Sequence, residues 1–377
     1  MKRKLVVVKV GTSSLTHEDG SMNLQQMKSL VDQVAGAVNV GHKIILVTSG
    51  AISSGIAELE IRRKPRDIVV QQVAAAVGQS ILMSHYRELF KPHSLKVAQV
   101  LLTQGDLSNR DAYVHVSNVL DGLLELGVVP VVNENDVTSI DEIIPVMKGL
   151  RVNFSDNDVL SALIANAMEA DLLVILSDVE GLYSKDPEEP SAELIQVVER
   201  VTPEISAMAE GKSQLGTGGM KTKIQAAEIA TQSGIPVVIA YSHRPNVLTD
   251  LLLGKRVGTL FKATGKMSSV KRWIAYGATI RGCVTVNTGA KEAILKGASL
   301  LPVGVMKVMG TFGIGDVISL SDEQGVEFAR GIANYTSEET NLIKAIQSNR
   351  VASILGYVRR KEVVLRKNLV FVEEARQ

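Results

Sequence analysis

The chain has 377 residues, of which 45% are hydrophobic and 21% are charged, and its formal net charge is +1. This composition is ordinary for a globular protein of two or three domains, and the small net charge favours no particular class of partner. A membrane-spanning helix is excluded, because no apolar run reaches the roughly 18 residues that one needs. The single cysteine, Cys283, excludes an intrachain disulfide and suits a reducing compartment, so we expect a cytoplasmic protein.

Short apolar runs alternate with longer amphipathic runs over the first 240 residues. The short runs are nearly continuous in apolar character, as buried strands of parallel sheets are. The predicted strands are 5–10, 43–47, 96–103, 128–132, 172–176 and 236–240, and the predicted helices are 23–40, 71–90, 112–126, 158–168 and 224–233. This rhythm predicts an α/β domain of three layers, with a mostly parallel sheet covered by helices on both faces.

Polar side chains gather where these predicted strands end. Lys9 lies near the end of the first strand, Ser49 follows the second, residues 133–136 follow the fourth, and Ser177 and Asp178 follow the fifth. Open α/β sheets bind ligands at the carboxyl ends of their strands. We therefore expect these side chains to share one edge of the sheet and to form a site there.

A glycine-rich loop precedes the predicted helix 224–233. Residues 215–223 read Leu-Gly-Thr-Gly-Gly-Met-Lys-Thr-Lys, so backbone N–H groups and the helix N-terminus can converge on a phosphate, with Lys223 in reach. The spacing matches neither the common phosphate-binding loop nor the dinucleotide fingerprint. Taken alone, the loop reads equally well as a linker whose glycines cap a helix.

Two lysines far apart in the sequence suggest the chemistry. Fixed cations such as Lys9 and Lys223 suit phosphoryl transfer, because negative charge moves between oxygens during the reaction. An acceptor that is already an ionised carboxylate needs no general base. Asp156 or Asp158 could hold the two lysines in line. The alternatives are that Lys9 reaches solvent from a strand end and that Asp156 only caps a helix.

Six motifs together resemble those of the amino-acid kinase superfamily, and in combination those of the glutamate 5-kinase family. The similarity covers nearly the whole chain. The motifs are VVKVGTS at 7–13, VTSGAI at 47–52, NEND at 133–136, DNDVLSA at 156–162, DVEGLY at 178–183 and GTGGMKTK at 216–223. The resemblance implies ATP-dependent phosphorylation of the side-chain carboxylate of L-glutamate to L-glutamyl 5-phosphate, the first step of proline biosynthesis.

The resemblance also implies roles for individual residues. Lys9, Lys223 and Asp158 would be catalytic, with Asp158 positioning the lysines. Ser49, Asp136, Asn157 and Asn133 would bind glutamate. The nucleotide would contact Lys9, Ser177, Asp178, Thr217, Gly218, Gly219, Met220, Lys221, Thr222 and Lys223. Mg²⁺ would be held mainly by the ATP phosphates and by water, with no protein metal ligand assigned. Feedback inhibition by proline and a homo-oligomer are further family traits.

The connection between Asp136 and Asp156 departs from the family pattern. Residues 137–155 are longer than the usual connection, and we expect them to alter the shape of the glutamate pocket and the response to proline. Two other functions stay open: a related kinase for acetylglutamate or aspartate, and an RNA-binding protein with an inactive kinase-like half.

The last hundred residues have a different sequence pattern, made mostly of short strand-like runs. We expect a kinase domain over 1–260, a linker over 261–270 and a β-rich domain over 271–377. Residues 297–305 resemble a PUA domain, with strand-like runs at 284–286, 304–309, 316–320, 327–332 and 363–365 and helices at 290–296 and 340–346. Residues 271–377 hold 15 Lys/Arg and 10 Asp/Glu. RNA is not the favoured ligand, because this basic excess is small and aromatic residues for base stacking are sparse.

Overall fold

The computed structural model describes residues 3–17, 20–61, 65, 67–138, 157–187, 189–210, 219–265 and 268–372. These form two compact units, one up to residue 265 except Ser108–Arg110 and the other over 268–372. Among the described residues, no helix is long and apolar enough to cross a membrane.

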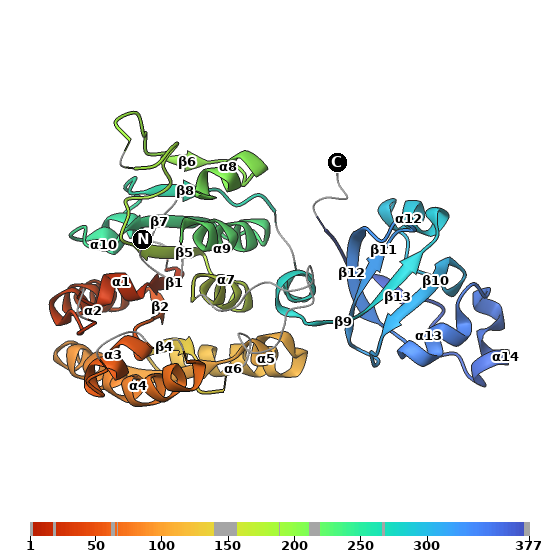
Figure 1. The fold of residues 1–377 in the computed structure, drawn as a ribbon, viewed down its shortest axis with the longest axis horizontal. Helices are drawn as coiled ribbons and strands as arrows, with labels where there is room; N and C mark the ends of the chain where they lie inside the picture. Colours follow the sequence, from red (N-terminus) through yellow and green to blue (C-terminus); the bar gives the residue numbers. More distant parts are fainter. Residues whose placement is uncertain are drawn as a thin grey trace. The chain divides into compact units, whose positions relative to one another are not determined.

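The N-terminal unit is built on an eight-stranded sheet with the order β3-β4-β2-β1-β5-β7-β8-β6 (Figure 1). Neighbouring strands are parallel except β7 and β8, which are antiparallel. The strands are β1 (Leu5–Val10), β2 (Lys43–Val47), β3 (Lys96–Leu102), β4 (Val128–Glu134), β5 (Leu172–Ser177), β6 (Val197–Val198), β7 (Val237–Tyr241) and β8 (Thr259–Phe261). The expected mostly parallel α/β sheet is confirmed.

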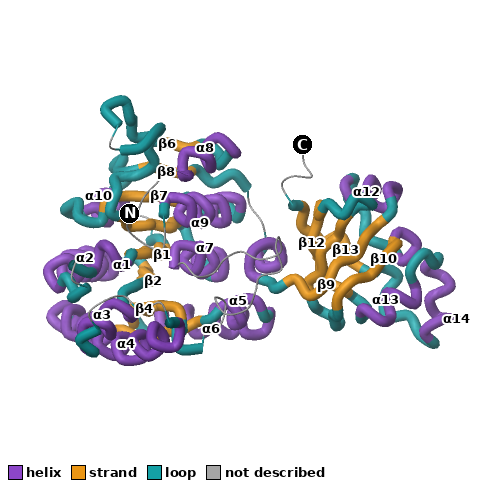
Figure 2. The backbone as a smooth tube through the Cα atoms, viewed as in Figure 1, coloured by secondary structure: helices purple, strands orange, loops and turns teal. Residues whose placement is uncertain are grey.

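Helices cover both faces of this sheet (Figure 2). They are α1 (Thr12–Leu15), α2 (Leu24–Asn39), α3 (Ala51–Glu58), α4 (Ile68–Phe90), α5 (Gln104–Ser108), α6 (Arg110–Glu125), α7 (Asn157–Ala167), α8 (Pro203–Ala207), α9 (Met220–Gln232) and α10 (Val247–Leu252), with short turns η1 (Lys91–His93) and η2 (Met208–Glu210). Helices α2 and α10 pack on one face, and α7 contacts β1 and α9 on the other.

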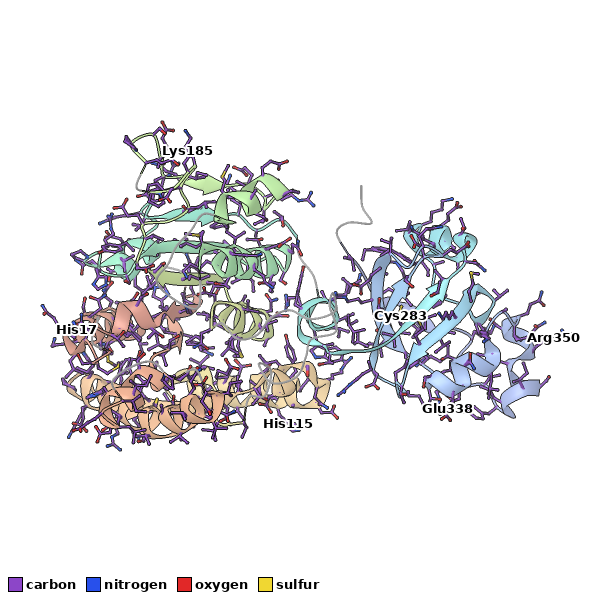
Figure 3. The ribbon with its side chains drawn as sticks, in the orientation of Figure 1. His17, His115, Lys185, Cys283, Glu338 and Arg350 are labelled. Atoms are coloured by element: carbon purple, nitrogen blue, oxygen red, sulfur yellow. The ribbon has the colours of Figure 1, made fainter. Side chains whose placement is uncertain are left out.

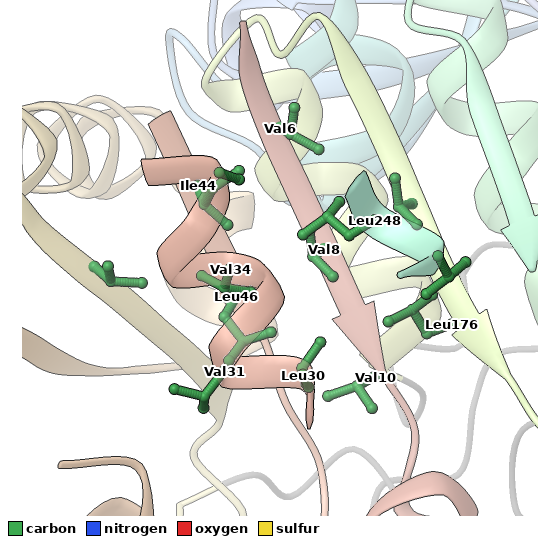
Figure 4. Close-up of a cluster of buried hydrophobic side chains, with 14 of the residues drawn as sticks. Val6, Val8, Val10, Leu30, Val31, Val34, Ile44, Leu46, Leu176 and Leu248 are labelled. Atoms are coloured by element: carbon green, nitrogen blue, oxygen red, sulfur yellow. The ribbon is translucent and has the colours of Figure 1, made fainter. Parts of the chain in front are cut away.

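The alternation along β1 decides which side chains enter the core and which reach the site. Val6, Val8 and Val10 point into a buried cluster with α2, β2, β5 and α10 (Figure 4). Because side chains of a strand alternate between the two faces, Val7 and Lys9 point to the opposite face. That is the face on which α7 contacts β1.

The C-terminal unit contains a five-stranded sheet with the order β10-β9-β11-β12-β13. Its strands are β9 (Ile280–Val286), β10 (Val305–Gly310), β11 (Val317–Ser321), β12 (Glu327–Ala333) and β13 (Val364–Phe371). Its helices are α11 (Ser269–Arg272), η3 (Trp273–Gly277), α12 (Thr288–Leu295), η4 (Pro302–Gly304), α13 (Ser337–Ile343), η5 (Ser348–Arg350) and α14 (Val351–Leu355). The unit has its own core around Val284, Ile318 and Phe328. Cys283, on β9, is a free thiol (Figure 3).

Several predicted boundaries were wrong. Helix α9 begins at Met220, not at 224, so four residues assigned to the glycine loop belong to the helix. Phe261 is the last residue of β8 and is buried, while the predicted domain boundaries around it stay a prediction. Helix α4 begins at Ile68, where the Asp67 side chain accepts hydrogen bonds from Val69 N and Val70 N. Strands β6 and β8 were not predicted.

Candidate active site

Lys9 and Lys223 lie on either side of the Asp158 carboxylate. Lys9 Nζ is 2.5 Å from Asp158 Oδ1, and Lys223 Nζ is 3.2 Å from Asp158 Oδ2. All three residues are buried, with Asp158 fully shielded from solvent and the lysines 4% and 7% exposed. Among the described residues, this cluster sets two cations against one anion, which suits binding of an anionic group.

The topology explains why these residues meet. The chain fills the sheet on one side of β1 with β2, β4 and β3, then passes to the other side with β5 and β7. Lys9 is at the carboxyl end of β1, the strand at which this order reverses. Open α/β sheets form ligand-binding crevices at such switch points. Asp158 and Lys223 come from the first turns of α7 and α9, which pack on each other.

Asp158 stays ionised in spite of its burial. Burial alone raises its pKa, but the charges of Lys9 and Lys223, with hydrogen bonds from Lys9 and Thr222, hold the pKa of this carboxyl below its usual value. Thr222 Oγ1 donates to Asp158 Oδ2 over 2.9 Å and also lies 2.9 Å from Gly219 O. Thr222 thus joins the carboxylate to the residue that precedes α9.

A second polar cluster lies beside the lysines. Asn157 Nδ2 donates to Ser49 Oγ over 2.8 Å, to Thr48 O over 3.0 Å and to Asn133 Oδ1 over 3.1 Å. Because Asn157 is next to Asp158 in the chain, the two clusters are contiguous. The structure therefore brings together three of the four residues predicted to bind glutamate. The fourth, Asp136, lies in the turn after β4.

Residues predicted to contact the nucleotide lie at the carboxyl end of β5 and at the start of α9. Ser177 is the buried last residue of β5, and its hydroxyl donates to Asp178 Oδ1 over 3.0 Å. Gly219 is the N-cap of α9 and has no side chain to satisfy the first N–H groups of the helix, which Met220 and Lys221 begin. Thr217 and Gly218 lie outside the described residues, as do residues 139–155 of the long connection.

The described residues contain no group of three or more His, Cys, Asp or Glu side chains placed to hold a metal ion. The buried carboxylate of the site, Asp158, is committed to two lysines. This donor set suits a metal ion that arrives bound to a nucleotide and keeps its phosphate and water ligands.

Sequence reasoning missed two contributors to the site, Tyr86 and Gln79. Tyr86 OH lies 2.7 Å from Thr48 Oγ1, and burial raises the pKa of Tyr86, so the phenol stays protonated. Asn133 Nδ2 donates to Gln79 Oε1 over 2.9 Å. The signal for Gln79 was its place directly after Gly78 in a helix otherwise rich in small apolar residues, but that pattern does not say which way a side chain points.

Comparison with known proteins identifies the family of each domain. Residues 4–241 match the model of the Amino acid kinase family, and residues 282–355 match the PUA domain. Glutamate 5-kinase from Caldanaerobacter subterraneus subsp. tengcongensis is 44% identical over 372 residues, which cover 98% of each chain. Glutamate 5-kinase from Moorella thermoacetica is 44% identical over 369 residues, 97% of this chain and 95% of that one.

Among solved structures, carbamate kinase from Giardia lamblia bound to AMP-PNP covers 70% of this chain and 99% of its own. Its sequence identity is 17% and the TM-score is 0.48, which is too low to add to the argument. The full-length relatives and the two matched domains decide the question: the chain belongs to the glutamate 5-kinase family, with an amino acid kinase domain followed by a PUA domain.

Proposed function

We propose that this chain transfers the γ-phosphoryl group of ATP to the side-chain carboxylate of L-glutamate, giving L-glutamyl 5-phosphate and ADP at the start of proline biosynthesis. The observation that carries the proposal is the buried pair of lysines on one aspartate, directly beside a cluster of neutral polar side chains. The two cations suit the phosphoryl group, and the neutral polar side chains suit the amino acid.

In the reaction, a carboxylate oxygen of glutamate forms a bond to the γ-phosphorus while the bond from phosphorus to the bridging oxygen of ADP breaks. The acceptor is ionised at neutral pH, so no proton has to be removed. Negative charge increases on the bridging oxygen, and Lys9 and Lys223 would stabilise it on the two sides of the transferred group. Asp158 would hold both ammonium groups in place, as a positioning residue rather than a base.

The remaining predicted residues divide between the two substrates. Ser49, Asn157, Asn133 and Asp136 would bind glutamate. Ser177, Asp178 and the segment from Thr217 to Lys223 would bind ATP, with the start of α9 directed to the phosphates. Mg²⁺ would neutralise part of the phosphate charge and would be held mainly by phosphate oxygens and water.

Trapping of the acyl phosphate with hydroxylamine tests the proposed reaction. The chain should form the hydroxamate from glutamate and ATP, and faster than from aspartate or acetylglutamate in parallel reactions. A preference for either of those two acids would assign the chain to the related activity instead. No turnover of any of the three, with salt-sensitive retention of bulk RNA on filters, would favour an RNA-binding protein with an inactive kinase-like half.

The role of Lys223 has its own test. Lys223→Ala should lower the rate of hydroxamate formation by at least about 100-fold, because one of two cations on the transferred group is removed. Lys255→Ala is the matched control, since Lys255 pairs with Asp250 on the surface at 2.7 Å. Unchanged turnover in a folded Lys223→Ala protein would contradict the role.

Inhibition by proline and a homo-oligomeric assembly belong to the same proposal. Proline titration of the hydroxamate reaction and light scattering of the full chain measure them. For the PUA domain we propose a structural or regulatory role rather than RNA binding.

A further inference from the structure

A continuous chain of side-chain amides crosses the carboxyl ends of β2 and β4. It begins at Ser49 and Thr48 O after β2, passes through Asn157 on α7 and Asn133 on β4, and ends at Gln79 on α4. It therefore connects α4 with the residue next to Asp158.

Backbone groups at two points fix which atoms of this hydrogen-bonded series of amides donate and which accept. Glu134 N donates to Asn133 Oδ1 over 2.9 Å, so this oxygen is the acceptor and Asn133 Nδ2 must donate to Gln79 Oε1. At the other end, Thr48 O can only accept, so Asn157 Nδ2 is the donor there. The orientation of each amide follows from these two backbone contacts.

Two polar atoms are left over by this arrangement. Among the residues that the structure describes, Gln79 Nε2 and Asn157 Oδ1 are both shielded from solvent and have no hydrogen-bond partner. One is a donor and the other an acceptor. Leaving such atoms unsatisfied costs free energy, so a pair of them beside a substrate site is suited to hydrogen-bond a bound ligand.

The position of Gln79 is set by close contact between helices. A Cβ atom on the preceding residue, Gly78, would lie 1.9 Å from Ala51 O and 2.4 Å from Gly55 N, so only glycine lets α4 approach the first turns of α3. The partner of Gln79, Asn133, follows Val132 on β4, and β4 is two strands from β1. Two strand spacings place β4 about 10 Å from the strand that carries Lys9.

The separation between β4 and β1 indicates where each end of the bound amino acid lies. The reacting carboxylate must lie at Lys9 and Lys223, so the α-carbon with its ammonium and carboxylate groups lies toward β4. A carboxylate only accepts hydrogen bonds and an ammonium only donates them. The leftover donor therefore fits the α-carboxylate, and the leftover acceptor fits the α-ammonium.

We propose that Gln79 is a further substrate-specificity residue, whose Nε2 donates a hydrogen bond to the α-carboxylate of glutamate. This inference rests on the proposed function. It adds a residue of α4 to the glutamate site and explains why the amide chain ends with a donor.

Two substitutions separate this role from mere support of Asn133. Gln79→Glu keeps an oxygen to accept from Asn133 but puts a negative charge where the donor was. Gln79→Met removes both functions at similar length. If Gln79 touches the substrate, the KM for glutamate should rise roughly 10-fold or more in Gln79→Met and further in Gln79→Glu, with the KM for ATP unchanged.

The opposite order would overturn the proposal. If Gln79 only orients Asn133, Gln79→Met should be the more impaired variant and Gln79→Glu close to wild type. Equal KM values for glutamate in wild type, Gln79→Met and Gln79→Glu would overturn it as well. Should Gln79→Glu not fold, the KM of Gln79→Met against wild type still decides, with no change excluding the contact. Gln347→Glu, the same change at an exposed glutamine, is the control. A wild-type chain that does not phosphorylate glutamate would instead refute the proposed function.

Discussion

At the scale of single residues, the ionised state of Asp158 is the feature on which the site depends. A fully buried carboxylate between two ammonium groups is stable only while all three partners remain charged. Replacing one member of a buried ion pair leaves an uncompensated charge, which costs about 3–5 kcal/mol. Asp158 therefore contributes to folding as well as to the position of the lysines.

We expect Asp158→Asn to be destabilised relative to wild type in a way that depends on pH. The pKa of Asp158 is lower in the folded chain than in the unfolded one. Its stabilisation is therefore complete above the unfolded value of about 3.9 and is lost as the pH falls through the lower folded value. Urea unfolding of both proteins should be measured from pH 7 down to pH 3. The difference between their free energies of unfolding should stay constant and narrow only below about pH 4.

Asp250→Asn provides the comparison, since Asp250 pairs with two exposed side chains, Lys255 and Arg244. Its unfolding midpoint should stay close to that of wild type over the same pH range. A gap for Asp158→Asn that persists unchanged at pH 3 would mean that the carboxylate does not carry the effect.

Sequence reasoning reached Lys9, Ser49 and Asn133 because each lies close to the carboxyl end of a strand, and strand ends in a parallel sheet converge whatever the details of packing. It did not reach Gln79. An amide in the middle of a helix has no such constraint, and its direction is decided by how closely Gly78 lets α4 approach α3. That distance is a tertiary property.

At the scale of elements, the contact between α3 and α4 is the closest helix packing around the site. Two glycines make it, since a Cβ on Gly55 would lie 1.7 Å from Ala74 O and one on Gly78 would lie 1.9 Å from Ala51 O. Helix α3 begins at Ala51, immediately after the glutamate-binding candidate Ser49 and Gly50, the latter with a φ of 104°. The packing of α4 therefore positions both α3 and the end of β2.

Gly78→Ala should separate the two helices, because backbone atoms cannot move aside as a flexible side chain can. We expect a loss of stability of about 1–3 kcal/mol or more and a higher KM for glutamate. Gly36→Ala is the matched control: Gly36 lies inside α2 with nothing within 4 Å of an added Cβ, so alanine should stabilise the helix by roughly 0.5–1 kcal/mol. Thermal unfolding of the three proteins measures both effects, and equal stability of the two variants would contradict the packing argument.

Element boundaries show where local sequence signals end. The start of α9 was placed four residues late, since residues 220–223 look like part of the glycine loop until Thr222 is seen bonded to Gly219 and Asp158. Strand β8 has three residues and pairs antiparallel with β7. So short a strand carries no periodicity of its own, and its pairing partner is what makes it a strand.

At the scale of the whole molecule, the two units have separate hydrophobic cores. The core of the N-terminal unit extends from β1 to α10, and that of the C-terminal unit from β9 to β13. The sequence predicted this division from a change in its pattern, but the boundaries of 260 and 271 stay a prediction. Gly265 bears on the first of them: a Cβ there would lie 2.9 Å from Gln232 O at the end of α9, and Thr264 N donates to Thr231 O over 3.0 Å.

These contacts show how far the N-terminal unit extends and suggest where it can be cut. All residues proposed for catalysis and binding lie between Lys9 and Lys223, so a chain that ends at Gly265 keeps every one of them together with strand β8, which pairs with β7 and β6. We expect residues 1–265 to form the hydroxamate from glutamate with a KM close to that of the full chain. A chain ending at Gly258 should fail to fold, because it loses β8 and the buried Thr259 and Phe261. Activity only in the full chain would show instead that the C-terminal unit takes part in the reaction or in its assembly.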